Sequence, residues 1–173
     1  RASRFVAVSR DGQDVLPGEG RAWQGPPPVE LVAGRGNAVN LLARQPGRYA
    51  VTTASGRTHT AVVESLPPAR ELQGPWEVHF QPNRGAPAHA TFDRLISWSE
   101  HSDSGVKYFS GAAAYCRTFQ WAPPPSRGAR HKWRTFLDLG RVAVIAEVRL
   151  NGRDLGTLWT PPYGLDVSNA LKP

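Results

Sequence analysis

The clearest structural signal in the sequence is the segment Glu147-Val148-Arg149-Leu150-Asn151-Gly152-Arg153-Asp154-Leu155-Gly156. Asn-Gly between two alternating runs predicts a tight hairpin, because a type I′ turn needs a positive φ at both central residues. The expected register sets Val148 opposite Leu155, facing a core, and Arg149 opposite Asp154, where an exposed ion pair can form. Turn chemistry and hydrophobic pattern therefore agree on an antiparallel hairpin.

Alternation with period two continues outward from this hairpin and predicts further half-buried strands. The stretches concerned are 48–53 and 58–63 (joined by a turn at 54–57), 76–80, 113–119 and 133–139. Short strands with Gly- and Pro-rich turns, and no amphipathic helix, favour an all-β fold, a β-sandwich or jelly roll. Prolines at 67 and 68 interrupt the pattern. We therefore expect a small, partial β-rich domain over 1–65 and a larger β-sandwich over 66–173.

Composition limits the class of protein. The chain has 173 residues, 40% hydrophobic, with 17 glycines and 16 prolines, which fits a globular β protein. No apolar run is long enough to cross a membrane, and the N-terminus lacks the apolar stretch of a signal peptide, as it would in a mature or truncated product. The net charge is +7. The one basic cluster, predicted to be a solvated loop entering a strand, comprises Arg127, Arg130, His131, Lys132 and Arg134. No nucleic-acid motif accompanies it, so neither a nucleic acid nor a membrane is expected as a partner.

The sequence offers little catalytic chemistry. Glycoside hydrolysis usually needs two carboxylates across a cleft, and the only close acidic pair in a polar setting is Glu100 and Asp103. Loop hydrogen bonding is the simpler interpretation of that pair, and a calcium site there is the weaker alternative. There is no Gly-x-Ser-x-Gly motif, the five histidines show no ligand spacing, and the single cysteine, Cys116, is expected to be buried and inert. We predict no catalytic residue, no metal ligand and no cofactor.

Aromatic residues are more suggestive. Six tryptophans are many for this length, and flat rings stack on the apolar faces of sugars. Trp98, Trp159 and Tyr163 lie in or beside predicted loops and are the candidate carbohydrate-binding residues. The alternative is that they anchor a core or a domain interface. Trp76 and Trp133 are expected in the core.

An ordered series of motifs carries a resemblance to a known family. It begins with Gly74-Pro75-Trp76-Glu77-Val78, passes through Ser97-Trp98-Ser99-Glu100-His101 and the predicted Asn-Gly hairpin, and ends with Leu158-Trp159-Thr160-Pro161-Pro162-Tyr163. This series, over residues 66–173, resembles the galactose-binding-like jelly roll of glycoside hydrolase family 2 and its relatives. More narrowly, it is similar to the C-terminal part of family 106 α-L-rhamnosidases. Residues 1–65 look like the end of a preceding β-domain.

The resemblance implies a non-catalytic accessory segment in a parent enzyme that hydrolyses terminal rhamnosides outside the cytoplasm, in an extracellular or periplasmic setting. Its partners would be the parent's catalytic barrel domain, which carries the acid and base, and a rhamnose-containing glycan. In the family a final strand follows Leu-Lys-Pro, whereas this chain stops at Pro173, which would leave an unpaired edge; a fragment, or a domain that needs a partner, is therefore expected. A stand-alone carbohydrate-binding module and a purely structural scaffold remain alternatives.

Overall fold

The computed structural model describes residues 5–10, 13–14, 27–34, 36, 38–125 and 132–172. The chain divides into two compact units. Unit 1 combines residues 1–68 with 124–172, and unit 2 is formed by residues 69–123. The predicted division between residues 65 and 66 is not decided by these units and stays a prediction.

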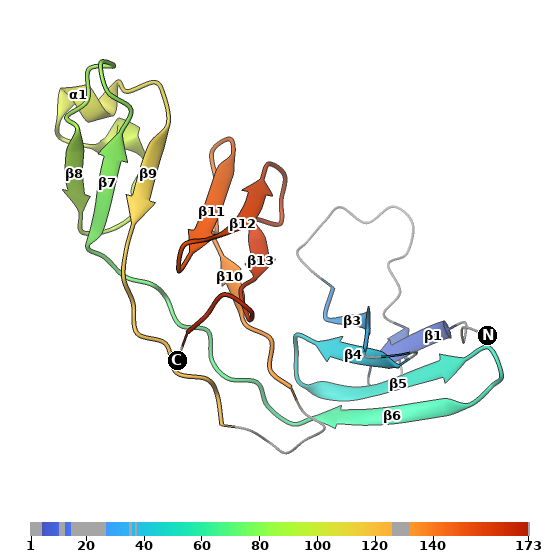
Figure 1. Ribbon diagram of the computed structural model, residues 1–173. Helices are drawn as coiled ribbons and strands as arrows, with labels where there is room; N and C mark the ends of the chain where they lie inside the picture. Colours follow the sequence, from blue (N-terminus) through green and yellow to red (C-terminus); the bar gives the residue numbers. More distant parts are fainter. Residues whose placement is uncertain are drawn as a thin grey trace. The chain divides into compact units, whose positions relative to one another are not determined.

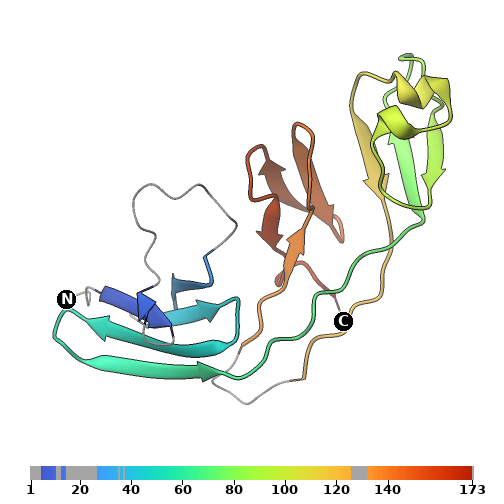
Figure 2. The same cartoon turned by 180° about the vertical axis from the view of Figure 1, so that it is seen from behind.

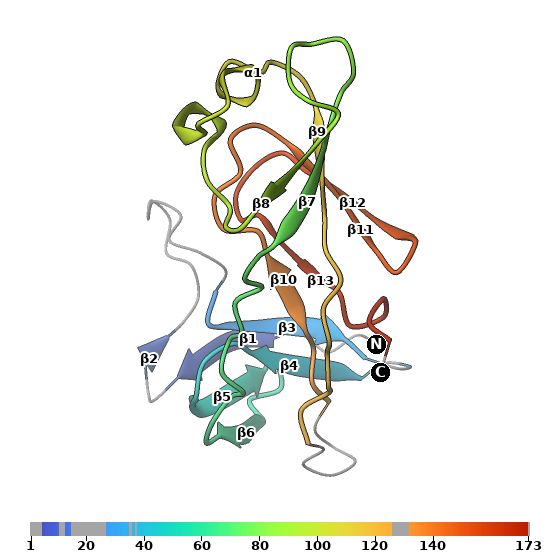
Figure 3. The same ribbon diagram turned by 90° about the vertical axis from the view of Figure 1, so that its left-hand side faces the viewer.

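The N-terminal part of unit 1 contains two antiparallel sheets that face each other (Figure 3). One sheet has the strand order β2-β1-β5-β6, and the other pairs β3 with β4. Tyr49 is fully buried between them with Val29 and Val51, because alternate side chains of β5 and β3 point to the same interior. The strands are β1 (Phe5–Arg10), β2 (Gln13–Asp14), β3 (Val29–Ala33), β4 (Val39–Ala43), β5 (Gly47–Thr53) and β6 (Thr58–Val63).

The predicted hairpin of residues 48–63 is confirmed by β5 and β6. The two strands pair from Gly47↔Val63 to Thr52↔Thr58. The connecting turn contains Gly56 with a φ of +79°, a left-handed conformation that glycine adopts without steric cost. Turn chemistry in the sequence therefore predicted the position of this hairpin.

Two further strand pairs lie in the C-terminal part of unit 1 (Figure 1). β10 (Phe136–Asp138) pairs with β13 (Gly164–Asp166), and β11 (Ala146–Leu150) pairs with β12 (Arg153–Leu158). The β10 strand is shorter than predicted; Gly140, at a φ of +62°, follows it as expected. The Arg44 guanidinium lies over the Phe136 ring at 5.2 Å, and this contact connects β10 to the N-terminal part of the unit.

The Asn-Gly hairpin is confirmed, with one correction to its register. Asn151 and Gly152 have φ values of +53° and +78°, as a type I′ turn requires. Arg149 pairs with Asp154 as predicted, but Val148 pairs with Gly156 because Leu155 is an extra residue in a β-bulge. The Asp154 carboxylate accepts a hydrogen bond from the Gly156 N–H (2.8 Å), and in the described structure no ion pair joins it to Arg149.

Unit 2 is a three-stranded antiparallel sheet with the order β8-β7-β9. Its strands are β7 (Trp76–Phe80), β8 (His89–Phe92) and β9 (Ala113–Cys116), so β9 ends earlier than predicted. The short helices η1 (Trp98–Glu100) and α1 (Ser104–Lys107) cover one face of the sheet (Figure 2). The core between sheet and helices contains Val78, Phe80, Phe92, Val106 and Phe109.

The predicted fold class is confirmed: the described chain is almost entirely β, with several antiparallel sheets and two single-turn helices, in a sandwich-like arrangement. Trp76 packs against the core of unit 2, as expected. Trp133 is half-buried and donates a hydrogen bond from its indole N–H to the Pro125 carbonyl (3.0 Å).

Candidate carbohydrate-contacting site

Trp98, the first predicted carbohydrate-binding residue, packs against the core of unit 2. Its ring meets the edge of Phe80 and of Phe109, with centroid separations of 5.9 and 5.2 Å. Its indole N–H donates a hydrogen bond to the Tyr115 hydroxyl. The ring and the polar atom of this partly buried tryptophan therefore both have partners inside the protein, which is the geometry of an anchor.

Tyr115, the acceptor in this contact, lies at the margin of the core, with 37% of its surface exposed. Burial raises the pKa of its hydroxyl, and the hydrogen bond from Trp98 partly opposes that rise. The Tyr115 side chain also meets the edge of Phe92, at a centroid separation of 6.0 Å. Trp98 and Tyr115 together extend the core toward the polar loop that carries η1.

Trp159, the second candidate, lies in the opposite environment. It directly follows β12, and 74% of its surface is exposed. Tyr163 comes four residues later, just before β13; it is half-buried, and its carbonyl accepts a hydrogen bond from the Leu139 N–H (2.8 Å). Trp159 is therefore free to contact a ligand or a partner, whereas the backbone of Tyr163 closes the β10–β13 pair.

The three candidates are divided between the two units. Trp98 belongs to unit 2, and Trp159 and Tyr163 belong to unit 1. Within unit 1, the segment between β12 and β13 holds both of its candidates in a short loop that includes Pro161 and Pro162. A carbohydrate-binding role for any of the three stays a prediction.

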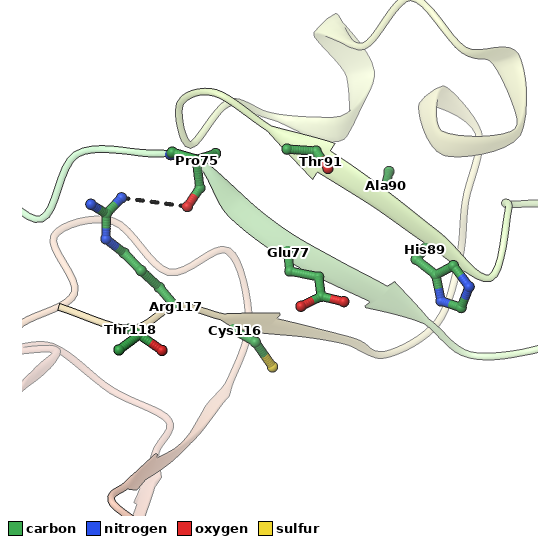
Figure 4. Close-up of a pocket in the computed structure, with 8 residues that line it drawn as sticks. All are labelled: Pro75, Glu77, His89, Ala90, Thr91, Cys116, Arg117 and Thr118. Atoms are coloured by element: carbon green, nitrogen blue, oxygen red, sulfur yellow. Dashed lines mark hydrogen bonds between the residues drawn. The ribbon is translucent and has the colours of Figure 1, made fainter.

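A polar hollow that the sequence did not reveal lies on unit 2. Figure 4 shows its lining side chains, which come from β7, β8 and β9 and the residues beside them. The members are Pro75, Glu77, His89, Ala90, Thr91, Cys116, Arg117 and Thr118. The alternation along β7 predicted that Glu77 and His79 share one face of the strand. The residues that complete the hollow were not predicted, because they depend on cross-strand pairing, which the sequence did not specify.

The charges around the hollow are balanced. The Glu77 carboxylate lies 3.2 Å from His79 Nε2, and the His79 ring meets the edge of the His89 ring at a centroid separation of 5.5 Å. The Arg117 guanidinium lies over the Trp76 ring and donates a long hydrogen bond (3.5 Å) to the Pro75 carbonyl. Glu77 is the only carboxylate among the described lining residues, so the hollow lacks the acid pair that glycoside hydrolysis usually needs.

The prediction that Cys116 is buried is wrong: this residue is exposed. β9 lies at the edge of the sheet, and Cys116 pairs with Glu77 on the face opposite the core. The alternation that turns Val78 and Phe80 inward turns Glu77 and Cys116 outward.

The weaker alternative is a calcium site at Glu100 and Asp103, but the Asp103 carboxylate already has another role in the fold. Asp103 is the N-cap of α1, and its Oδ1 accepts the N–H groups of Gly105 (2.7 Å) and Val106 (3.2 Å). In the part of the chain that the structure describes, no group of three or more His, Cys, Asp or Glu side chains is placed to hold a metal ion.

The predicted basic loop falls mostly outside the described residues, since Arg127, Arg130 and His131 lie between 125 and 132. Of its other members, Lys132 is exposed, and Arg134 forms an ion pair with Asp166 (3.3 Å). Over the described ranges, no helix has the length and apolar character needed to cross a membrane.

Comparison with known proteins gives two informative matches. No family model matches the chain. It is 42% identical over 127 residues to a protein of Formosa agariphila named "Putative beta-glucuronidase", an alignment that covers 73% of this chain and 11% of that protein. The structure of a rhamnosidase from Novosphingobium sp. PP1Y superimposes with a TM-score of 0.52 and 26% sequence identity, covering 85% of this chain and 20% of the rhamnosidase.

Both matched proteins carry glycoside hydrolase names, and in each the matched part is a small share of a much longer chain. The sequence match and the structural match agree on this class of enzyme name. The chain is therefore a glycoside hydrolase-related β segment that spans 11% of the curated relative and a fifth of the solved rhamnosidase.

Proposed function

We propose that this chain is a non-catalytic accessory segment of an α-L-rhamnosidase-like glycoside hydrolase. In this proposal a catalytic barrel elsewhere in the parent polypeptide hydrolyses terminal rhamnosides, and residues 66–173 form a galactose-binding-like sandwich. The observation that carries the proposal is the superposition on the rhamnosidase, which extends over 85% of the chain at 26% identity. The motif series from Gly74 to Tyr163 supports the same parent class.

The side chains support an accessory role. The hollow on unit 2 has one carboxylate, Glu77, among its described lining residues, and Asp103 is committed to capping α1. Hydrolysis of a glycosidic bond would need a second carboxyl group across a bound sugar. An extracellular or periplasmic location is part of the proposal. Calcium at Glu100 and Asp103 is the weaker addition, because it would have to share Asp103 with the helix cap.

A paired assay tests the proposal. The purified 173-residue chain and the longer natural polypeptide that contains it are each incubated with an aryl α-L-rhamnoside and an aryl β-D-glucuronide. We expect no hydrolysis by the chain alone and release of rhamnose by the longer polypeptide. Turnover of either substrate by the chain alone would disprove the accessory role. Cleavage of only the glucuronide by the longer polypeptide would disprove the rhamnosidase assignment.

Direct binding of carbohydrate is a second candidate function, and the exposed ring of Trp159 favours it. Calorimetric titration of the chain with a rhamnose-containing polysaccharide measures it. If Trp159 and Tyr163 form a sugar platform, Trp159→Ala abolishes the binding heat, whereas Tyr108→Ala, which removes an equally exposed aromatic ring from unit 2, leaves it unchanged. If the unmodified chain gives no binding heat, the structural scaffold role is the one that remains.

A further inference from the structure

The tip of the β11–β12 hairpin holds the only Asn-Gly pair in the sequence, Asn151-Gly152. Both residues are exposed to solvent. Because glycine has no side chain, the backbone nitrogen of Gly152 can approach the side-chain amide carbon of Asn151 without steric hindrance. Attack of that nitrogen on that carbon is the first step of asparagine deamidation, the reaction that makes asparagine a thermolabile residue. The hairpin tip therefore carries the pair of residues in which this reaction meets the least hindrance.

The Asn151 side chain also has a structural role. Its amide nitrogen, Nδ2, donates a hydrogen bond to the Ala170 carbonyl (2.8 Å). Ala170 is buried and lies in the turn formed by residues 167–171. In that turn the N–H groups of Ala170 and Leu171 both donate to the Val167 carbonyl (2.9 and 3.1 Å). The Asn151 amide therefore ties the hairpin tip to the turn that follows β13.

A second contact reaches the same turn from the other side of the hairpin tip. The Arg153 guanidinium donates a hydrogen bond to the Asn169 carbonyl, at the longer distance of 3.3 Å. The Arg153 side chain is exposed, and an exposed contact of this length contributes little. The shorter hydrogen bond, from Asn151 to a buried residue, is therefore the stronger of these two links.

Deamidation removes the group that forms the Asn151 hydrogen bond. The Gly152 nitrogen loses its proton and bonds to Asn151 Cγ, the Cγ–Nδ2 bond breaks, and ammonia leaves. Water then opens the five-membered ring and leaves aspartate or isoaspartate in place of asparagine. A carboxylate has no N–H group to donate, and its oxygens would face the Ala170 carbonyl oxygen, which is itself an acceptor. The product therefore cannot form the hydrogen bond of the native hairpin tip.

We infer that Asn151 is a site of spontaneous deamidation and that the reaction releases the 167–171 turn from the hairpin tip. Water is the only co-reactant. The folded hairpin holds Asn151 in a type I′ turn with its amide on Ala170, so the reaction proceeds when the tip opens locally. The inference is independent of the proposed parent activity, because every reacting group belongs to this chain.

Peptide mapping by mass spectrometry tests the first part of the inference. The 173-residue chain is incubated at mildly alkaline pH, which favours loss of the Gly152 amide proton, and conversion of each asparagine is followed with time. Asn83 is the matched control, because it is exposed and has a positive φ (+61°) like Asn151 (+53°), but Arg84 follows it. We expect conversion of Asn151 to be at least about tenfold faster than that of Asn83, since only Asn151 precedes a glycine.

Two outcomes of this experiment would contradict the inference. Equal rates at Asn151 and Asn83 would show that the glycine gives the hairpin tip no special reactivity. Conversion of Asn151 in urea, with none in the folded chain over the same period, would show that the folded turn prevents the reaction.

Hydrogen exchange of the Ala170 and Leu171 amides tests the release of the turn. Asn151→Asp reproduces the product and should make these amides exchange about three- to tenfold faster, the change expected from the loss of one hydrogen bond. Asn151→Gly, which keeps a sequence favoured in type I′ turns but has no side chain, should show the same increase. Asn83→Asp makes the same chemical change in unit 2 and should leave both amides unchanged. Exchange at the unmodified rate in Asn151→Gly would show that the Asn151 side chain does not hold the turn.

Discussion

Trp98 and Trp159 occupy contrasting environments, although the sequence presents both as tryptophans in polar loops. Trp98 lies over Phe80 and Phe109 and donates its indole N–H to Tyr115. Trp159 directly follows β12, and 74% of its surface is exposed. Trp98 already stabilises the unit that contains it, whereas Trp159 can contribute only when a ligand or a partner covers it.

The difference teaches that a loop position does not determine the role of an aromatic residue. Trp98 belongs to a loop that folds back over a sheet, where Asp103 caps α1 and directs Val106 into the core. Trp159 belongs to a loop that connects two strand pairs, and the described part of unit 1 contains no helix that could cover it. The covering element, and not the local polarity of the sequence, decides which tryptophan is buried.

The largest expected effect that follows from this comparison is the loss of the Trp98 ring. Trp98→Ala should lower the free energy of unfolding by about 2–4 kcal/mol, because it opens a cavity beside Phe80 and Phe109 and leaves the Tyr115 hydroxyl without its donor. Urea denaturation followed by circular dichroism measures the loss. Trp98→Phe, which keeps an aromatic ring, is the control and should cost less than half as much. A change in the free energy of unfolding below about 0.5 kcal/mol, the size typical of surface substitutions, would show that Trp98 is not an anchor.

A smaller, pH-dependent effect is expected at Tyr115. Burial raises the pKa of this hydroxyl in the folded chain, so the unfolded chain loses the proton first as the pH rises. The stabilisation is fully present below the ordinary tyrosine pKa, about 10, and is lost as the pH rises through the higher folded-state pKa. Tyr115→Phe should cost about 0.5–1.5 kcal/mol at neutral pH, through the lost hydrogen bond from Trp98, and should reduce the loss of stability above about pH 10.

Denaturation curves between neutral and alkaline pH measure both parts of this prediction. Tyr108→Phe is the matched control: the Tyr108 side chain is largely exposed, so loss of its hydroxyl should change the stability at neutral pH by no more than about 0.5 kcal/mol. An unchanged alkaline slope in Tyr115→Phe would show that the Tyr115 hydroxyl is not linked to folding.

Much of the fold followed from the sequence where turn chemistry and alternation coincide. Asn151 and Gly152 specified their hairpin, Gly56 marked the β5–β6 turn, and the alternation along Trp76–Phe80 gave the faces of β7. These features are local, since each depends on residues only a few positions apart. The bulge at Leu155 was not predicted, because the spacing of the apolar residues does not distinguish a hairpin with one extra residue from a regular hairpin.

The candidate site was less predictable because it depends on cross-strand and long-range packing. The polar hollow requires Glu77, Thr91 and Cys116 to be neighbours, and their pairing joins three strands separated by long loops. The exposure of Cys116 and the burial of Trp98 depend equally on which face of the sheet the helices cover. Composition and alternation identify such residues but cannot say which of them meet.

The smallest expected effect on the stability of the chain is that of Trp159→Ala, and it sharpens the comparison most. Because most of the Trp159 ring is in water already, its removal should change the free energy of unfolding of the 173-residue chain by no more than about 0.5 kcal/mol. Thermal unfolding of the chain with and without the substitution measures the change. A loss of about 2 kcal/mol or more, the size typical of a buried aromatic ring, would mean that the Trp159 ring is packed in the folded chain, and the contrast between the two tryptophans would then disappear.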